Sequence, residues 1–359
     1  MSDGRRDFIL MISSLDRFVY RASQGARFSW YFGQKLLAAR LADRMGGRTP
    51  TPPEIKARMP STRRLLNDLR ALLRRDLENI EAGLYRLPAD LADSPFQAFA
   101  KARRFFADLA VVNDRRQAGR HQEVREQQPA GKFPRYYLQN FHYQTDGYLS
   151  AQSAELYDHQ VEVLFSGGGD AMRRQALVPL GEAVRRRGIR ASRLIDIGCG
   201  TGRFLREIKA NYPRLSVTAL DLSPFYLAEA RKTLAPWSRT RFVEAPAEAV
   251  PEPDGSYDIV TSVYLFHELP AEQRRLAAGE MARLLAPGGT LILVDSLQIG
   301  DIPDYDALLE YFPVSFHEPY FANYARDDLA ALFAPLGLTL ECVDLAYFSK
   351  VVTLKKAVA

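Results

Sequence analysis

The second half of the chain alternates between short apolar runs and amphipathic stretches. The apolar runs have the length of strands and lie near residues 193–197, 216–221, 240–243, 257–263, 289–296, 338–344 and 347–355. The stretches between the first five have the period of amphipathic helices. This alternation predicts an α/β fold, a doubly wound, Rossmann-like sheet of seven mostly parallel strands with helices on both faces. Ligands of such sheets bind outside the carboxyl ends of the strands.

The first 132 residues have the pattern of helices instead. Apolar side chains at helical spacing predict helices at 7–45, 61–84 and about 95–109, and the polar, basic stretch 113–132 is interpreted as a linker or mobile arm. Residues 1–135 hold 26 Lys and Arg against 15 Asp and Glu, whereas the remainder holds 22 against 28. We therefore predict a helical, basic N-terminal domain at 1–132, a gate with lead-in helices at 133–192 and the sheet domain at 193–359.

The few cysteines and the short apolar runs indicate the cellular compartment and the kind of metal site that the chain could form. Cys199 and Cys342 are too few for a disulfide framework or for a cysteine-based metal site. The apolar run at 8–12 is too short for a signal peptide, and no run approaches the length of a membrane span. We expect a cytoplasmic protein that needs no metal.

The most informative segment is a strand end, glycine turn and helix start at 194–204. After Asp196 come three glycines at alternate positions, Gly198, Gly200 and Gly202. Glycine permits positive φ and lets a ligand approach the backbone, and the N–H groups of a helix start are free to donate. Asp221, at the tip of the next predicted strand, can accept hydrogen bonds from both hydroxyls of a ribose.

The spacing of the glycines narrows the choice of ligand. Arg203 occupies the third position of the dinucleotide fingerprint G-x-G-x-x-G, which argues against a dehydrogenase, and the chain has no phosphate-binding P-loop. An acid beside the turn suits a cationic ligand better than a pyrophosphate. The segment therefore predicts a site for a cationic nucleoside.

Together with three later motifs, the glycine turn resembles the class I S-adenosylmethionine-dependent methyltransferases. The motifs are FVEAPAE at 242–248, YDIVTS at 257–262 and LLAPGG at 284–289, and the resemblance extends over roughly 150–359. Within that superfamily, the chain is similar to the small-molecule and quinone-type enzymes (methyltransferase type 11-like). The resemblance implies S-adenosyl-L-methionine as cofactor and an antiparallel end to the sheet. The cofactor residues that it implies are Asp196, Gly198, Cys199, Gly200, Gly202, Asp221, Leu222, Ala247, Glu248 and Tyr157. Since Pro246 stands where such enzymes often carry an acid, Glu248 or a backbone carbonyl would have to meet the adenine.

Two aromatic segments are expected to close the site. In the related enzymes, the segment before the first strand folds over cofactor and substrate, which implies that role for Tyr148 and Tyr157. The alternative is that these aromatic residues only join the two domains. The long aromatic connection at 297–325 is expected to form a lid, because a connection of this length in a compact domain is usually functional.

Histidines near these segments are the candidate catalytic bases. His267 follows the fourth strand and His317 lies in the lid, and each precedes a glutamate. Neighbouring residues on a helix do not face each other, so neither pair is a ready-made dyad, and each histidine could instead cap a helix or serve packing. The further candidate substrate residues are Tyr148, His142, Tyr264, Tyr320 and Tyr324.

The expected activity is methylation, on oxygen or carbon, of a small aromatic or lipophilic acceptor. A protein of this fold that binds the cofactor without methyl transfer is the alternative from another class. Nucleic-acid methylation is disfavoured, because the segment 261–264 (TSVY) lacks the N/D-P-P-Y motif of such enzymes. The N-terminal helices could be a cap, a homodimer surface or a face that contacts the inner side of a membrane peripherally.

Overall fold

The computed structural model describes residues 13–46, 51–88, 94–128 and 131–358. Its centre is a seven-stranded sheet with the strand order β3-β2-β1-β4-β5-β7-β6, in which β7 runs antiparallel to both of its neighbours and the other pairings are parallel. The strands are β1 (Arg193–Ile197), β2 (Ser216–Asp221), β3 (Thr240–Glu244), β4 (Tyr257–Val263), β5 (Leu285–Ser296), β6 (Leu338–Ala346) and β7 (Ser349–Lys356). The predicted fold class is confirmed.

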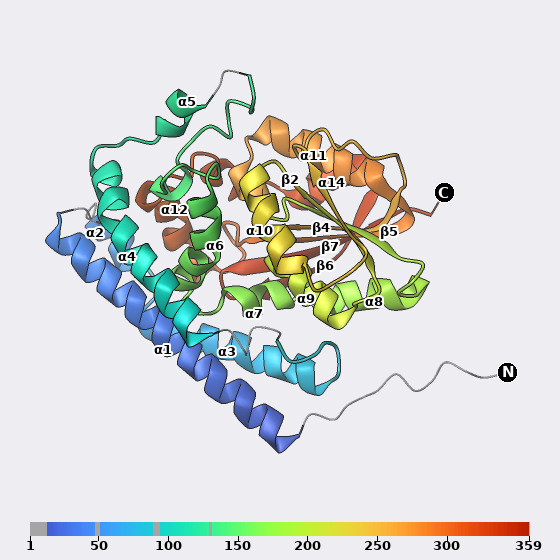
Figure 1. The fold of residues 1–359 in the computed structure, drawn as a ribbon, viewed down its shortest axis with the longest axis horizontal. Coiled ribbons are helices and arrows are strands. Elements are labelled where there is room, and N and C mark those ends of the chain that lie inside the picture. The colour runs from blue at the N-terminus through green and yellow to red at the C-terminus, as the bar shows by residue number, and fades with distance from the viewer. Residues whose placement is uncertain (1–12, 47–50, 89–93, 129–130, 359) are drawn as a thin grey trace.

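Helices cover both faces of this sheet (Figure 1). On one face, Leu194 of β1 and Val217 of β2 share a core with α8 (Leu177–Arg187), α9 (Arg203–Asn211) and α10 (Pro224–Leu234). On the other face, Ile195 shares a core with α11 (Ala271–Leu284) and α14 (Leu329–Phe333). Successive strand residues point to opposite faces, which explains why the buried strands are apolar at nearly every position.

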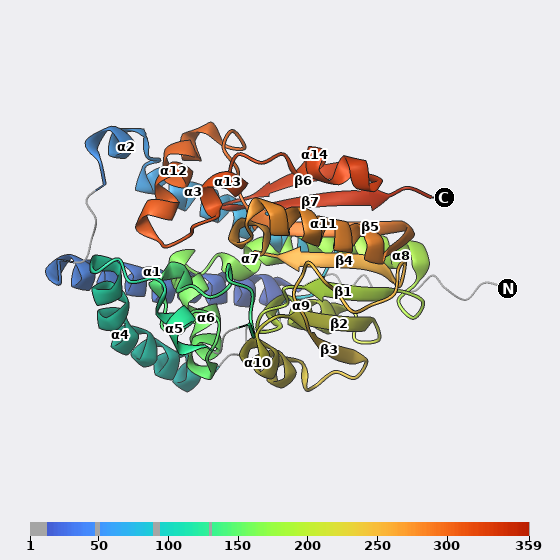
Figure 2. The ribbon, with the colours of Figure 1, turned by 90° about the horizontal axis from the view of Figure 1, so that it is seen from above.

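The N-terminal helices lie at one end of the sheet in both views (Figures 1 and 2). They are α1 (Ser14–Arg44), α2 (Pro53–Arg58), α3 (Thr62–Glu81), α4 (Pro95–Gln117) and α5 (Glu123–Gln127). They share cores with the sheet domain: Leu69 and Leu72 of α3 pack with Met172 of α7 (Gly169–Arg174). A buried ion pair of 2.6 Å between Asp76 Oδ2 and Arg174 Nη2 ties α3 to the same helix. These helices therefore help to build the end of the sheet where ligands bind.

One detail of the helical prediction needs correction. About half of the linker expected at 113–132 is helical, because α4 continues to Gln117 and α5 follows. Arg115 anchors this region: it is buried, pairs with Glu123 at 2.8 Å and donates to the carbonyl oxygen of Tyr143 at 2.8 Å. The first part of the helix expected at 7–45, the apolar run at 8–12 and residues 129–130 lie outside the described residues.

Helices and turns gather over the carboxyl ends of the strands. The gate contains η2 (Phe141–Tyr143) and is followed by α6 (Ala151–Leu164). A further short turn, η3 (Phe266–Glu268), follows β4. The connection expected as a lid is mostly helical, with η4 (Pro303–Tyr305), α12 (Asp306–Ser315) and α13 (Phe321–Tyr324); α14 is followed by η5 (Ala334–Leu336). Among the helices that the structure describes, none combines the length and the apolar character needed to span a membrane.

Candidate active site

A cavity of about 110 Å³ lies at the carboxyl ends of β1, β2 and β4, where the sequence predicts a ligand. We call it the turn cavity. Its floor is the glycine turn and the tips of the strands, and its walls are aromatic side chains from the gate and α6. The residues of the floor are Asp196, Gly198, Cys199, Gly200, Thr201, Asp221, Leu222, Ala245 and Ala247.

The glycine turn requires its glycines for two different reasons. Gly198, Gly200 and Gly202 have φ values of 74°, 54° and 75°, in the left-handed region that disfavours side chains. A Cβ added to Gly202 would meet the Cα of Ala230 at 3.3 Å, so this glycine allows α9 and α10 to pack. A Cβ on Gly200 would meet only Tyr226 Cδ1 at 4.0 Å. The open side of Gly200 faces the turn cavity and leaves room for a ligand.

Carboxylates at two strand tips fix the shape of the turn. Asp221 accepts hydrogen bonds from the backbone N–H groups of Gly200 and Ser223, both at 2.8 Å. Burial raises the pKa of Asp221 to about 6, although these N–H groups oppose the shift. Burial likewise raises the pKa of Asp196 to about 7, against the hydroxyl of Thr261, which donates at 2.6 Å. Both carboxyls gain by meeting a positively charged or hydrogen-bond-donating ligand.

An acid on α6 has an unused acceptor in the same cavity. Asp158 accepts a hydrogen bond from the hydroxyl of Thr201 at 2.9 Å through Oδ2. Its Oδ1 is buried and has no hydrogen-bond partner among the described residues. A buried carboxylate oxygen without a donor is costly, so this atom is suited to a ligand's ammonium group.

A larger apolar cavity, of about 400 Å³, adjoins the turn cavity. We call it the apolar cavity. The two share three lining residues, Tyr157, Tyr264 and Glu268. Helix α12 and the residues after it line the far side of the apolar cavity, and a neighbouring cavity of about 250 Å³ extends from it between α1, α4 and α6. The connected space has the size and the apolar lining of a site for a small organic molecule.

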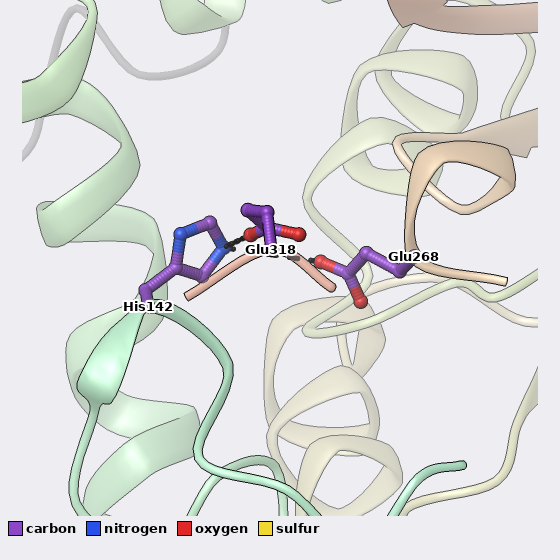
Figure 3. Close-up of side chains that lie close together, drawn as sticks. All are labelled: His142, Glu268 and Glu318. Atoms are coloured by element: carbon purple, nitrogen blue, oxygen red, sulfur yellow. Dashed lines mark ion pairs between the residues drawn. The ribbon is translucent and has the colours of Figure 1, made fainter. Parts of the chain in front are cut away.

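Histidines and carboxylates gather at the junction of the two cavities. His267 Nδ1 lies 2.6 Å from Asp295 Oδ1, which leaves Nε2 directed toward Glu268 Oε1 at 3.8 Å. The hydroxyl of Tyr148 donates to Glu268 Oε1 at 2.5 Å. His142 Nε2 lies 2.8 Å from Glu318 Oε1 (Figure 3). These groups come from separate segments of the chain and meet only in the folded protein.

The proximity of these groups shifts their pKa values. Burial opposes protonation of His267, but the charge of Asp295 outweighs it and raises the pKa of His267 to about 9. Burial and the neighbouring Glu318 raise the pKa of Glu268 to about 7. Burial also opposes protonation of His142, but the charge of Glu318 outweighs this effect and raises the pKa of His142. The cluster thus holds protons near neutral pH.

Comparison with known proteins identifies the domain that carries this site. Residues 194–289, from the glycine turn to the turn before the main part of β5, match the family model of a methyltransferase domain. This stretch of the chain therefore has the sequence of a methyltransferase domain. The chain spans about half the length of the curated relatives that it matches.

Several relatives are methyltransferases named for quinone-type substrates. The chain is 38% identical over 104 residues to the demethylmenaquinone methyltransferase of Thermus thermophilus, which covers 29% of this chain and 46% of that protein. It is 34% identical over 152 residues to a ubiquinone/menaquinone biosynthesis C-methyltransferase of Methylobacterium nodulans, covering 42% and 58%. The solved N-methyltransferase NodS of Bradyrhizobium japonicum aligns with a TM-score of 0.39 at 18% identity, over 52% of this chain and 87% of that one, a likeness too distant to bear on activity.

The lining of the turn cavity suits S-adenosyl-L-methionine, the cofactor that the resemblance of the glycine turn implies. The open side of Gly200 leaves space for a ligand against the backbone, and Asp221 offers carboxylate oxygens at the strand tip. The unpartnered Oδ1 of Asp158 matches the ammonium group of the cofactor's methionine part. The residues present are therefore those that would hold this cofactor.

Most residues predicted to bind the cofactor line the turn cavity, and two do not. Those that line it are Asp196, Gly198, Cys199, Gly200, Asp221, Leu222, Ala247 and Tyr157. Gly202 instead packs against Ala230. The carboxylate of Glu248 accepts a hydrogen bond from Tyr136 at 2.7 Å, so that Tyr136 lies between Glu248 and the cavity.

The candidate substrate and catalytic residues divide in the same way. Tyr148 lines the turn cavity, His142 and His267 line the apolar cavity, and Tyr264 lines both. His317 does not line either cavity: its Nε2 lies 2.8 Å from Gln139 Oε1 and its ring stacks on His121. Nor do two tyrosines of the lid, since Tyr320 is hydrogen bonded to Gln139 and Tyr324 donates to the carbonyl oxygen of Ser296. His317, Tyr320 and Tyr324 thus line neither the turn cavity nor the apolar cavity.

Several site residues were missed from the sequence. Asp158 follows the predicted gate residue Tyr157, and Glu268 follows His267, so both were adjacent to residues that were singled out. Asp295 had a usable signal, because it lies at the carboxyl end of β5, next to the residues that follow the neighbouring parallel strand β4. Glu318 gave no such signal, since its contact with His142 depends on how the gate and the lid fold.

Proposed function

We propose that this protein transfers the methyl group of S-adenosyl-L-methionine to an oxygen or carbon atom of a small, lipophilic or aromatic acceptor. The observation that carries the proposal is the junction of the turn cavity with the apolar cavity at Tyr157, Tyr264 and Glu268. A cofactor in the first and an acceptor in the second would meet there. The names of the quinone-type relatives support the same class of acceptor.

The site's own residues suit this reaction. When bound, the cofactor supplies a methyl carbon on a positively charged sulfur, which passes to the acceptor's nucleophilic atom as the acceptor gives up a proton. Tyr157 and Tyr264 would align the two molecules and exclude water from between them. Glu268 stands at the junction and, with a pKa raised to about 7, is placed to take the proton near neutral pH.

The apolar cavity can be filled without touching the turn cavity. Val161 of α6 lines the apolar cavity and its extension but not the turn cavity. We expect Val161→Trp to lose methyl transfer to hydrophobic phenols and quinols and to keep the wild-type affinity for S-adenosylmethionine. Val111→Trp is the matched control, because Val111 is 48% exposed on α4. Val111→Trp should change neither the methyl transfer nor the affinity for S-adenosylmethionine.

The assay measures S-adenosylhomocysteine formation with a panel of phenols, quinols, RNA and DNA, together with calorimetric cofactor affinity. Binding of the cofactor without turnover on any acceptor of the proposed class would favour the alternative, a binding protein of this fold. Faster transfer to RNA or DNA than to the phenols and quinols would contradict the proposed acceptor class.

The N-terminal helices offer a surface for a partner, and we propose that they contact a membrane surface or a second copy of the chain. Large apolar side chains are exposed on α1 and α4, among them Leu15, Phe18, Phe96 and Phe99. Light scattering of the protein alone and co-sedimentation with anionic vesicles would distinguish the two contacts.

A further inference from the structure

Three side chains with metal-binding atoms converge between the turn cavity and the apolar cavity. His142 belongs to η2, Glu268 to η3 and Glu318 to the link between α12 and α13 (Figure 3). One ligand atom of each lies within 4.8 Å of those of the other two. His142 Nε2 is 2.8 Å from Glu318 Oε1 and 3.9 Å from Glu268 Oε1.

This spacing is close to what a small divalent cation requires. With bonds of about 2.0–2.2 Å, neighbouring ligand atoms around such an ion lie roughly 3–3.5 Å apart. The observed separations bracket that range, so small side-chain movements would bring the atoms into place. A site of this kind needs no rearrangement of the backbone.

The burial of Glu318 is the independent observation that points to a ligand. The residue is 1% exposed. Its Oε2 has no hydrogen-bond partner among the described residues, and Oε1 has His142 as its ion-pair partner. Glu268 lies in the same cluster. A carboxylate so far withdrawn from water, with so few donors, is costly unless a cation meets it.

A second histidine lies beside the cluster. Nε2 of His267 lies 3.8 Å from Glu268 Oε1, while Nδ1 of the same ring is held by Asp295 at 2.6 Å. In metal sites, a carboxylate often holds the far nitrogen of a histidine in this way. The hydroxyl of Tyr148 holds Glu268 in a similar way, at 2.5 Å.

We propose that His142, Glu268 and Glu318 bind one divalent transition-metal ion. One nitrogen and two oxygen donors, with water or the acceptor at the remaining positions, suit Zn²⁺, Co²⁺, Mn²⁺ or Fe²⁺. The sequence alone predicted no metal, because the donors lie on segments far apart in the chain and have no motif spacing.

The inferred position of the ion also specifies the chemical class of the acceptor. This step rests on the proposed function. His142, His267 and Glu268 all line the apolar cavity, so an open coordination position would face it. The ion would hold an oxygen atom of the acceptor beside the junction with the turn cavity. The acceptor is then a lipophilic molecule with a phenolic or enolic oxygen at one end.

Metal binding can be measured without cofactor or acceptor. The full chain, stripped with a chelator, is titrated with Co²⁺ while its visible absorption is followed, and Zn²⁺ is then added in competition. We expect one equivalent of Co²⁺ per chain, ligand-field bands of low coordination number, displacement by Zn²⁺ and a higher unfolding temperature in the presence of the metal.

Variants identify the ligands. Glu318→Gln and His142→Gln should each lower the affinity for Co²⁺ by about tenfold or more. His317→Gln is the matched control, because His317 is next to Glu318 in the chain but is paired with Gln139. It should bind Co²⁺ like the wild type. Thermal melts of the metal-free variants show whether each is folded.

Two results would overturn the metal site: wild-type protein that takes up no Co²⁺ or Zn²⁺, or folded Glu318→Gln and His142→Gln variants with wild-type affinity. The outcome is separable from that of the proposed function. Methyl transfer by protein that binds no metal would leave the methyltransferase activity standing and remove the metal. Stoichiometric metal binding without any methyl transfer would leave the metal site standing and remove the proposed methyltransferase activity.

Discussion

Gly200 and Gly202 form a matched pair in which the same substitution should have opposite main effects. Both have left-handed backbone conformations, with φ of 54° and 75°. An alanine there costs about 1–2 kcal/mol of folding free energy because of its Cβ. The two positions differ in what surrounds that Cβ, so the pair separates a ligand contact from a packing contact.

The added methyl group at Gly202 would be crowded. It would lie 3.3 Å from the Cα and the Cβ of Ala230 and from Leu234 Cδ1. Overpacking of this kind costs typically about 1–3 kcal/mol more. Gly202→Ala should therefore lower the free energy of unfolding by roughly 2–5 kcal/mol in total. Its folded fraction should still bind the cofactor.

The added methyl group at Gly200 would meet only Tyr226 Cδ1, at 4.0 Å. Gly200→Ala should therefore cost no more than the backbone term, about 1–2 kcal/mol. Its methyl group would enter the turn cavity, where the cofactor approaches the backbone. We expect the affinity for S-adenosylmethionine to fall by about tenfold or more, equivalent to at least about 1.4 kcal/mol. The larger Gly200→Val should abolish binding while the protein stays folded.

Urea unfolding gives the stability of each variant, and calorimetric titration with S-adenosylmethionine gives its affinity. Wild-type affinity in Gly200→Ala would show that the cofactor does not contact this turn. Equal stability of the two alanine variants would show that the contact between Gly202 and α10 does not limit packing.

Two further predictions concern titratable groups. Asp221→Asn should lower cofactor affinity by about tenfold or more in calorimetry, since a hydrogen bond to a charged group is worth roughly 1.5–3 kcal/mol. The amide oxygen of the variant can keep one of the hydrogen bonds from the N–H groups of Gly200 and Ser223, which limits damage to the turn. An unchanged affinity would show that Asp221 does not bind the ribose. Burial lowers the pKa of His159 to about 4, and its Nε2 lies 2.8 Å from Gln34 Oε1. The unfolded chain therefore takes up this proton below pH about 6.5 and the folded chain only below about 4, so stability falls as the pH is lowered through that window, by roughly 2 kcal/mol at pH 5. His159→Gln should lose that part of the dependence in urea unfolding at pH 7 and pH 5; an unchanged difference would exclude His159 as its source.

Local patterns were sufficient to predict the strands. The predicted runs at 193–197, 216–221 and 257–263 coincide with β1, β2 and β4, because a strand buried on both faces is apolar throughout and ends at polar or glycine residues. The start of β5 was predicted too late. It begins at Leu285, before the Pro-Gly-Gly turn, because Leu285 pairs with Tyr257 across an irregularity in the ladder.

The cluster at the cavity junction could be predicted only in part. His267 and Asp295 meet because β4 and β5 are neighbouring parallel strands, which brings their carboxyl ends together. That His142 meets Glu318 depends on contacts between the gate and the lid, such as the hydrogen bond from the backbone N–H of His142 to the carbonyl oxygen of His317. His142 also has a left-handed backbone, with φ of 55°, which its residue type did not indicate.

A second buried acidic cluster in the same protein shows how this fold neutralises carboxylates that have a structural role. Asp170, also nearly inaccessible, is paired with Arg203 at 2.5 Å and with Arg27 at 2.9 Å. Burial alone would raise the pKa of Asp170, but these guanidinium groups hold it well below its ordinary range. Arginine remains charged at all relevant pH values, so Asp170 needs no ligand. Glu318 is buried to a similar degree and Glu268 somewhat less, but the ion-pair partners of both are imidazoles, which can lose a proton and bind a metal through the same nitrogen. A cluster balanced by exchangeable protons, beside a cavity, can accept a cation in their place, whereas the arginine-balanced cluster cannot.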